Sequence, residues 1–158
     1  MSKIAPHLWF ADKAEEATAF YVSLFPDSAI VGVTDSPADT PNGPAGSVQI
    51  IDFILAGQQF IAINAGPLDP FDHAISFVVN CTDQDEVDRY WNALSEGGLT
   101  EQCGWLKDRF GVSWQIVPTV LTDMIADSNR ERAARVMGAM LGMVKLDIAG
   151  LKKTCGGE

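Results

Sequence analysis

The sequence predicts an α+β protein with two modules of the same βαβββ order and a helical C-terminal segment. Strand-like and helix-like runs recur in one order at a spacing of about seventy residues. Clusters of glycine and proline separate these runs, and after Pro118 the hydrophobic spacing becomes helical only. We therefore expect a first module over residues 1–66, a second over 67–118 and C-terminal helices over 119–158, within one structural domain overall.

The first module is expected to contain four strands and one helix. Its apolar residues recur at three- and four-residue spacing between residues 13 and 24, which indicates a helix, and Asp12 is placed to cap it. Ala56 and Gly57 indicate a hairpin turn. The strands are expected over 4–10, 29–34, 48–55 and 59–64.

The second module repeats this order. Its helix is expected to start at a cap formed by Thr82 or Asp83 and to end at Ser95, before Gly97 and Gly98. A tight turn that carries Asp108 and Gly111 joins the last two strands. The strands are expected over 74–80, 99–101, 104–107 and 112–117.

The segment after Pro118 is expected to be wholly helical. A short helix over 120–126 precedes a longer one, which Ser128 or Asn129 caps and which carries Met137 and Met140 on an apolar face. This face packs against its own sheet or against a second subunit. We favour dimerisation for part of the surface, because the segment lies outside the two-module repeat, and so we expect a homodimer.

Composition limits the function. The 158 residues carry a formal net charge of −10, which disfavours binding to the phosphate backbone of nucleic acids. No apolar run is long enough to span a membrane, and the N-terminal stretch does not resemble a secretion signal. The three cysteines have no CxxC spacing, as is typical of reduced thiols. We expect a cytoplasmic protein with no nucleic-acid or membrane partner.

Four blocks of sequence carry a family resemblance. They are APHLWFADKAEEATAFYVSLFPDS, LAGQQFIAINAGP, HAISFVVNCTDQDEVDRYWNAL and CGWLKDRFGVSWQIVP. With these blocks the chain resembles the PhnB-like branch of the vicinal oxygen chelate superfamily, which also contains glyoxalase I, fosfomycin and bleomycin resistance proteins and extradiol dioxygenases. The resemblance runs from about Lys3 to Met143 and implies that the two modules form a cupped mixed sheet.

Many members of this branch carry the name "3-demethylubiquinone-9 3-methyltransferase". A Rossmann-type methyltransferase needs a glycine-rich loop after its first strand to hold its cofactor. Here the first strand is followed by ADKAEEA, which has no glycine. The sequence therefore does not support a methyltransferase activity.

The resemblance also implies positions for a metal site. In the metal enzymes of the superfamily, four side chains from the cup strands hold a divalent ion. The matching positions here are His7 or its neighbour Pro6, then His73, then Ala62 or Asn64, and finally Gln115, where glyoxalases have a glutamate.

Too few of these side chains are nitrogen or carboxylate ligands to predict a full site. We expect no cofactor. If a divalent metal is bound, its ligands are His73, His7 and Gln115, and this requires His7 to point into the cup.

Without a metal, the cup is expected to bind a neutral or mildly polar organic ligand. Strand alternation places Ser113, Gln115 and Val117 on one face, with Trp114 on the other beneath the helices. The expected ligand-binding residues are Gln115, Trp105, Asn64, Ser76 and His7. Core packing is the favoured interpretation of Trp9, Trp91 and Trp114, whereas the role of Trp105 stays open.

His73 is the one candidate general acid or base, because histidine titrates near neutral pH. The alternative is a surface or strand-edge histidine that follows an acidic turn. The sequence leaves four functions open. They are a small-molecule-binding protein of this fold, a divalent-metal-dependent lyase, isomerase or dioxygenase, a protein that sequesters an antibiotic or toxin, and, as the weakest, a purely structural role for a dimer. It does not decide whether the protein is an enzyme.

Overall fold

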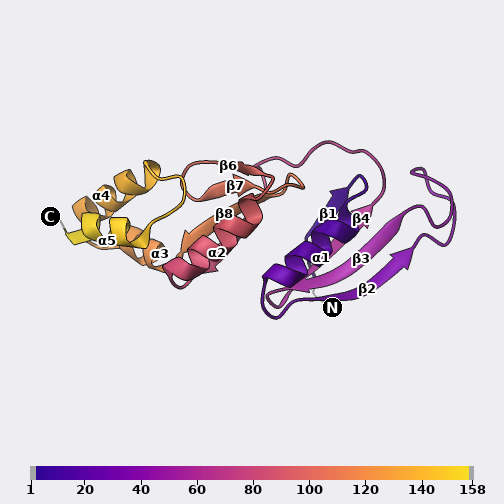
Figure 1. Ribbon diagram of the computed structural model, residues 1–158, viewed down its shortest axis with the longest axis horizontal. Helices are drawn as coiled ribbons and strands as arrows, with labels where there is room; N and C mark the ends of the chain where they lie inside the picture. Colours follow the sequence, from indigo (N-terminus) through magenta and orange to yellow (C-terminus); the bar gives the residue numbers. More distant parts are fainter. Residues whose placement is uncertain (1–2, 157–158) are drawn as a thin grey trace. The chain divides into compact units, whose positions relative to one another are not determined.

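The computed structural model describes residues 3–156, and the chain divides between Asp69 and Pro70 into two compact units. Each unit contains one four-stranded sheet with a helix across it (Figure 1). The α+β class, the βαβββ order of each module and the C-terminal helices are confirmed.

The first unit holds one helix and four strands, and the chain order of the strands differs from their order in the sheet. The elements are β1 (His7–Phe10), α1 (Ala14–Leu24), β2 (Ala29–Asp35), β3 (Gln49–Leu55) and β4 (Gln58–Asn64). The sheet order is β1-β4-β3-β2, with β1 parallel to β4 and the other neighbours antiparallel.

Helix α1 covers one face of this sheet because its small and aromatic residues lie on one side. Ala17 and Tyr21 are fully buried, as is Phe53 on β3. Strand alternation then places the buried residues of β3 toward α1 and the half-buried residues Asp52 and Ile54 on the opposite, open face.

The start of α1 differs from the prediction. Lys13, rather than Asp12, is the N-cap residue, and its side chain makes no capping hydrogen bond. The first amide of the helix, Ala14 N–H, instead donates to Asn64 Oδ1 at 2.7 Å. A side chain from the end of β4 thus satisfies a helix amide that local sequence leaves without a cap.

The second unit repeats the topology of the first. Its module consists of β5 (Phe77–Cys81), α2 (Gln84–Ser95), β6 (Leu99–Thr100), β7 (Trp105–Lys107) and β8 (Ser113–Pro118). The sheet order is β5-β8-β7-β6, and β5 is parallel to β8. Helix α2 packs on β5, β7 and β8 through an apolar stripe that includes Val87 and Leu94.

Local residues fix the start of α2. Asp83 is the N-cap and accepts a hydrogen bond from Glu86 N–H at 2.9 Å. The Glu86 carboxylate in turn accepts from Thr82 N–H at 2.8 Å, so two amides near the helix start are satisfied by neighbouring side chains. The predicted cap is confirmed at Asp83.

The predicted turn between β7 and β8 is organised by Asp108, which is only 3% exposed. Its Oδ1 accepts from the backbone amides of Phe110 and Val112, and its Oδ2 accepts from Trp114 Nε1 at 2.8 Å. A buried carboxylate with three donors is well satisfied, and it fixes Trp114 in the core beneath α2.

The C-terminal segment forms three helices, α3 (Thr119–Ile125), α4 (Arg130–Leu141) and α5 (Ile148–Gly156). The sequence predicted the first two, with Asn129 confirmed as a cap, but it did not predict α5. The helices share a small core formed by Leu121, Val136, Leu146 and Leu151. Val117 of β8 packs against this core, so the helices contact their own module's last strand.

Backbone hydrogen bonds join the segment after α4 to the start of β7. Cys103 N–H donates to Met143 O at 2.8 Å, and Gly104 N–H donates to Val144 O at 2.9 Å. Gly104 has a positive φ of 79°, and a Cβ there would lie 2.6 Å from Ile116 O, so only glycine allows this close approach.

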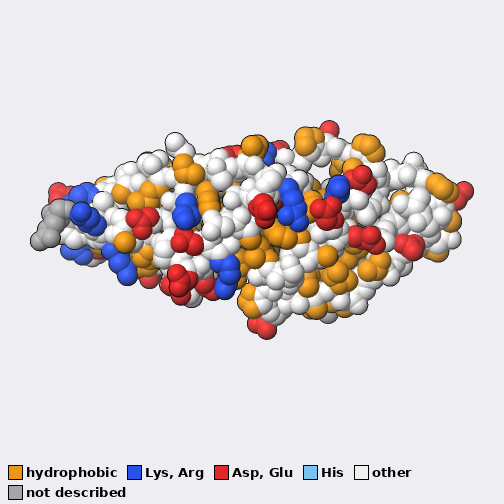
Figure 2. All heavy atoms as spheres, in the orientation of Figure 1, with side chains coloured by type: hydrophobic (Ala, Val, Ile, Leu, Met, Phe, Trp, Pro, Cys, Tyr) orange, Lys and Arg blue, Asp and Glu red, His pale blue; other side chains and the backbone are white. Residues whose placement is uncertain are grey.

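The surface matches the acidic composition. Figure 2 shows basic side chains interspersed with acidic ones on the face in view, rather than gathered into a broad basic patch. Within residues 3–156, no helix has both the length and the apolar character that crossing a membrane requires.

Candidate functional site

The open face of the second sheet, on the side away from α2, gathers most of the expected site residues. The register pairs Trp105 on β7 with Gln115 on β8 and Lys107 with Ser113. Alternation puts these side chains on one face, while Trp114 and Ile116 are buried on the other. The face is therefore polar and aromatic along β7 and β8.

His73 lies at the edge of this face and is held at both ring nitrogens. Its Nδ1 is 2.8 Å from Ser113 Oγ, and its Nε2 is 2.8 Å from Glu101 Oε1. Because a carboxylate only accepts, Nε2 carries the proton in the hydrogen bond to Glu101. The side chains of Ser113, His73 and Glu101 are thus linked through the two nitrogens of the imidazole ring. Ser113 Oγ also donates to the backbone oxygen of Asp72 at 3.3 Å.

This chain of Ser113, His73 and Glu101 does not make an exposed nucleophile. Ser113 is only 2% exposed, whereas the side chains of His73 and Glu101 are 36% and 40% exposed. The accessible chemistry is that of an imidazole beside a carboxylate, which can take up or release a proton at the surface of the sheet.

Trp105 and Gln115 form the middle of the site. The rings of Trp105 and His73 meet edge to face, with their centroids 5.2 Å apart. Gln115 Nε2 donates to Ser76 Oγ at 3.0 Å. Gln115 and Trp105 on the sheet thus contact Ser76 and His73 in the segment before β5, and all four are residues that the sequence analysis singled out.

A pocket of about 200 Å³ continues from Trp105 and Gln115 toward the C-terminal helices. Its walls come from the sheet on one side and from α3, α4 and the segment before α5 on the other. The lining residues are Cys103, Trp105, Gln115, Val117, Leu121, Thr122, Ile125, Met140 and Leu146.

The other two expected site residues, His7 and Asn64, belong to the first unit. His7 is exposed and alternates with the buried Leu8 and Phe10, so it lies on the face opposite α1. Asn64 caps α1 through Ala14, as described above, and its amide nitrogen lies 3.5 Å from Gln49 Oε1. We leave Asn64 out of the site because its side chain is used to start the helix.

The residues do not fit the metal site that the superfamily implies. Over residues 3–156, no three His, Cys, Asp or Glu side chains come together in a way that could hold a metal ion. His73 already uses Nδ1 with Ser113 and Nε2 with Glu101, and Gln115 lacks the carboxylate that divalent metals prefer. We derive no step through a metal.

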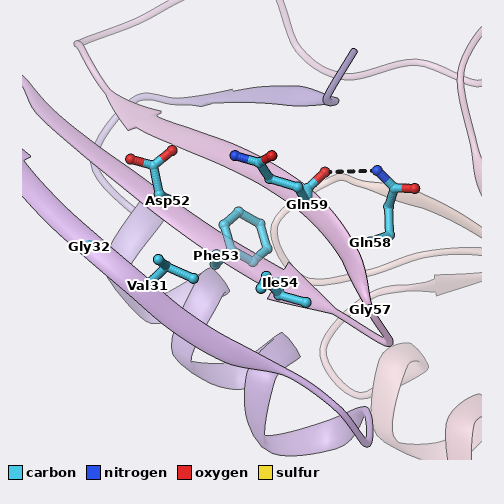
Figure 3. Close-up of a pocket in the computed structure, with 8 residues that line it drawn as sticks. All are labelled: Val31, Gly32, Asp52, Phe53, Ile54, Gly57, Gln58 and Gln59. Carbon is cyan, nitrogen blue, oxygen red and sulfur yellow. Dashed lines mark hydrogen bonds between the residues drawn. The ribbon is translucent and has the colours of Figure 1, made fainter. Parts of the chain in front are cut away.

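The first unit has an open hollow of about 640 Å³ at the β2–β3–β4 edge of its sheet. It is lined by Val31, Gly32, Asp52, Phe53, Ile54, Gly57, Gln58 and Gln59 (Figure 3). Figure 3 shows the Gln58 side chain hydrogen-bonded to Gln59 O, at 3.0 Å. The hollow offers one carboxylate and two amides but no histidine, so the second sheet is the stronger candidate for proton chemistry.

Sequence reasoning missed Glu101 and the role of Ser113. Glu101 follows the weak two-residue strand β6, and Glu101 N–H donates to Trp105 O, which brings its side chain to the same face. The available signal was the hairpin of β6 and β7, which puts the residue after β6 opposite Trp105. Ser113 was assigned to the correct face but was not considered as a partner of His73.

The cysteines differ in their surroundings. Burial raises the pKa of the Cys81 thiol to about 12, with a smaller effect from the Glu86 carboxylate, so Cys81 is a thiol rather than a thiolate near neutral pH. Cys103 and Cys155 are half-buried, and all three cysteines are free.

A family model described as 3-demethylubiquinone-9 3-methyltransferase matches residues 2–117 of this chain. The chain belongs to this family. The match covers both βαβββ modules and ends before α3. No protein with a curated function matches the chain.

Solved structures of similar proteins agree with this PhnB-like assignment. A PhnB protein from Bacillus cereus, described as a 3-demethylubiquinone-9 3-methyltransferase, is 35% identical with a TM-score of 0.67, over 75% of this chain and 100% of that chain. Protein PA1353 from Pseudomonas aeruginosa is 23% identical with a TM-score of 0.57, over 75% and 98%.

The fosfomycin resistance protein FosX from Listeria monocytogenes is 14% identical with a TM-score of 0.55, over 77% of this chain and 94% of that chain. At this identity the likeness concerns the fold alone. It places the PhnB-like family member in the vicinal oxygen chelate fold that the sequence blocks predicted.

Proposed function

We propose that this PhnB-like protein binds a small, neutral or mildly polar organic ligand on the open face of its second sheet, without a resident metal. The observation that carries the proposal is the gathering of Trp105, Gln115, Ser76 and the His73–Glu101 pair on that face. Trp105 supplies an aromatic wall, and the amide, hydroxyl and imidazole groups supply a few fixed polar contacts.

Three properties of the residues support this proposal over a metal-dependent reaction. His73 has both ring nitrogens engaged, Gln115 is an amide, and the described residues form no three-ligand cluster of His, Cys, Asp or Glu. A methyltransferase activity is not proposed, because the turn between β1 and α1 has no glycine to hold a nucleotide-like cofactor.

Benzamide, a neutral aromatic amide, is a suitable probe. Titrated into ¹⁵N-labelled protein, it should shift the Trp105 indole N–H, the Gln115 side-chain amide and the backbone amides of His73 and Ser76. Trp105→Leu should abolish the shifts at Gln115, His73 and Ser76 because the aromatic wall is lost, whereas Trp91→Phe, a change on the buried face of α2, should keep them. Shifts confined to other residues, or no shift at all, would contradict the proposal.

Metal content gives a second test. Protein purified without chelators should contain well under one divalent ion per chain by elemental analysis. One tightly held ion per chain, lost in His73→Ala, would overturn the proposal in favour of a metal-dependent lyase, isomerase or dioxygenase.

We also propose that the protein is a cytoplasmic homodimer. Its three free cysteines suit a reducing compartment. At the end of α4 and just after it, Leu141 and Val144 remain 54% and 46% exposed, although Val136 and Met140 pack inward. Light scattering of the wild-type protein should give twice the mass of one chain, and Leu141→Lys should lower the measured mass. A wild-type mass equal to that of one chain would exclude the dimer.

A further inference from the structure

We propose that the pocket between the second sheet and the C-terminal helices is a binding compartment for a single-ring molecule that carries one O–H or N–H donor. The pocket is the one of about 200 Å³ described above, between β7–β8 and helices α3 and α4. The pocket shares Trp105 and Gln115 with the proposed ligand-binding face. This inference rests on the proposed function only through these two residues.

The volume sets the size of the ligand. A liquid water molecule takes up about 30 Å³, and an apolar protein cavity of about 150 Å³ is known to accept benzene. A pocket of about 200 Å³ is therefore large enough for one six-membered ring with a substituent.

The walls set its polarity. Leu121, Ile125 and Leu146 make an apolar lining, and Met140 adds a flexible thioether that adapts to ring shapes. Among the polar side chains, Gln115 uses its amide nitrogen to donate to Ser76 Oγ, so the carbonyl oxygen is the group it presents to a ligand. A donor on the ligand complements that oxygen, while an apolar ring fits the rest.

The helical wall is held in place before any ligand arrives. Met143 O and Val144 O accept from the amides of Cys103 and Gly104 at the start of β7. Gln84 of α2 binds both sides of Leu146, donating to Leu146 O at 3.2 Å and accepting from Ile148 N–H at 2.9 Å.

An ion pair adds to this attachment, with Lys145 Nζ at 2.6 Å from Asp88 Oδ1 of α2. A wall tied to both β7 and α2 loses little conformational freedom when a ligand binds, and such preorganisation favours affinity.

Most of the compartment lies beyond the part of the chain that the family model matches. Leu121, Thr122, Ile125, Met140 and Leu146 all follow residue 117, where the family match ends. The Bacillus cereus protein is covered over its full length by 75% of this chain, so about a quarter of the chain has no counterpart in it. The C-terminal helices thus add a specificity-determining wall to a shared fold.

Phenol and toluene are the probes, because they have the same ring and nearly the same size but differ in the hydroxyl donor. Each is titrated into ¹⁵N-labelled full-length protein at millimolar concentrations. Both should shift the amides of Cys103 and Thr122. Phenol should bind at least as tightly as toluene because the Gln115 carbonyl oxygen accepts a hydrogen bond from its hydroxyl group.

Two variants on one helix locate the site. Met140→Trp fills the pocket and should weaken both probes more than tenfold. Met137→Trp lies on α4 but is exposed and does not line the pocket, so it should change binding less than twofold. Amide exchange of α4 in both variants checks that the helix remains folded.

A third variant tests the polar contact without filling the pocket. Gln115→Leu removes the acceptor and leaves a buried ligand hydroxyl unpaired, so the preference should move toward toluene by about tenfold. If the preference does not move, the donor requirement is wrong.

Cysteine reactivity offers an independent readout in the wild-type protein. Iodoacetamide should modify Cys103 more slowly when phenol is present, with Cys155 as the internal control outside the pocket and Cys81 unreactive near neutral pH.

The outcomes separate this inference from the proposed function. Benzamide shifts at His73 and Ser76, outside the pocket, without any effect of phenol or toluene on Cys103 or Thr122 would overturn the inference alone. Shifts by phenol and toluene that survive Met140→Trp would overturn it as well. Binding of both rings in the pocket, with no benzamide shift at the backbone amides of His73 and Ser76, which do not line it, would remove only the proposed function.

Discussion

The two modules repeat one element order, yet they close their central hairpins in different ways. Between β3 and β4, Ala56 and Gly57 both have positive φ angles, of 47° and 79°, as in a two-residue hairpin turn that backbone conformation alone fixes. Between β7 and β8, the buried carboxylate of Asp108 fixes a longer turn through two backbone amides and Trp114. The comparison shows that one topology can depend on backbone geometry in one module and on a side chain in the other.

The open faces of the two sheets also differ in the kinds of side chain that they carry. In the first unit, β3 and β4 place Ile50, Ile54, Ile61 and Ile63 on the face opposite α1, where Asp52 is a rare carboxylate. In the second unit the corresponding face carries a chain of hydrogen bonds through His73. Repetition of the backbone therefore left the side-chain chemistry of the two open faces free to differ, and the His73–Glu101 pair belongs to the second unit.

The largest expected effect comes from removing Asp108. Asp108→Ala leaves the Phe110 and Val112 amides and the Trp114 indole without their acceptor, and should lower the free energy of unfolding by about 3 kcal/mol or more. Chemical denaturation and amide exchange of β8 measure this. Asp52→Ala, on the open face of the first sheet, is the control and should cost less than about 0.5 kcal/mol. Equal effects would mean that the turn does not depend on the buried carboxylate.

The two helix starts should show smaller, local effects. Asn64→Ala removes the distant cap of α1 and Asp83→Ala the local cap of α2, and each should cost about 1 kcal/mol. Hydrogen exchange should accelerate in the first turn of α1 for one variant and of α2 for the other. If Asn64→Ala leaves α1 unchanged, the cross-strand cap contributes nothing to stability.

The turn between β3 and β4 can be improved. Ala56 has a left-handed backbone conformation, which is unfavourable for alanine and which asparagine tolerates better. Ala56→Asn should therefore raise the free energy of unfolding by about 0.5–1 kcal/mol. Gly57→Ala is the matched opposite, since its φ of 79° is unfavourable for alanine, and it should destabilise. Thermal and chemical denaturation of both variants test the pair, and a destabilising Ala56→Asn would contradict the assigned turn.

The smallest effect is expected at the His73–Glu101 pair. Glu101→Gln keeps the shape and removes the charge, and because both side chains are more than a third exposed, the change in stability should stay below about 0.5 kcal/mol. A larger loss would show that the pair is a structural support of the second sheet rather than an accessible chemical group.

Sequence patterns predicted the parts of the fold that depend on local periodicity. Both module helices, the hairpin at Ala56 and the turn at Asp108 follow from spacing and turn residues. Helix α5 was not predicted, because its burial depends on Leu151 reaching a core formed with Leu121 and Val136 from elsewhere in the tail. The cap of α1 failed for a similar reason: Asn64 is fifty residues away from Ala14.

The candidate site could also be predicted only where it depends on local sequence. Alternation along β8 was enough to place Gln115 and Ser113 on one face. The partnership of His73 with Glu101 was not predictable from spacing, because the two residues are 28 positions apart and meet only through the pairing of β6, β7 and β8. A short stretch of sequence does not indicate which residues meet across a sheet.

The parallel pairing of the first and last strand in each module has a consequence for protein synthesis. Strand β1 finds its neighbour only when β4 has left the ribosome, and β5 must likewise wait for β8. Such non-local pairs form slowly and leave apolar strand edges uncovered in the meantime. The first sheet can nevertheless be completed while the second is still being translated, so we expect nascent chains just long enough for β4 to leave the ribosome to be the first that resist proteolysis.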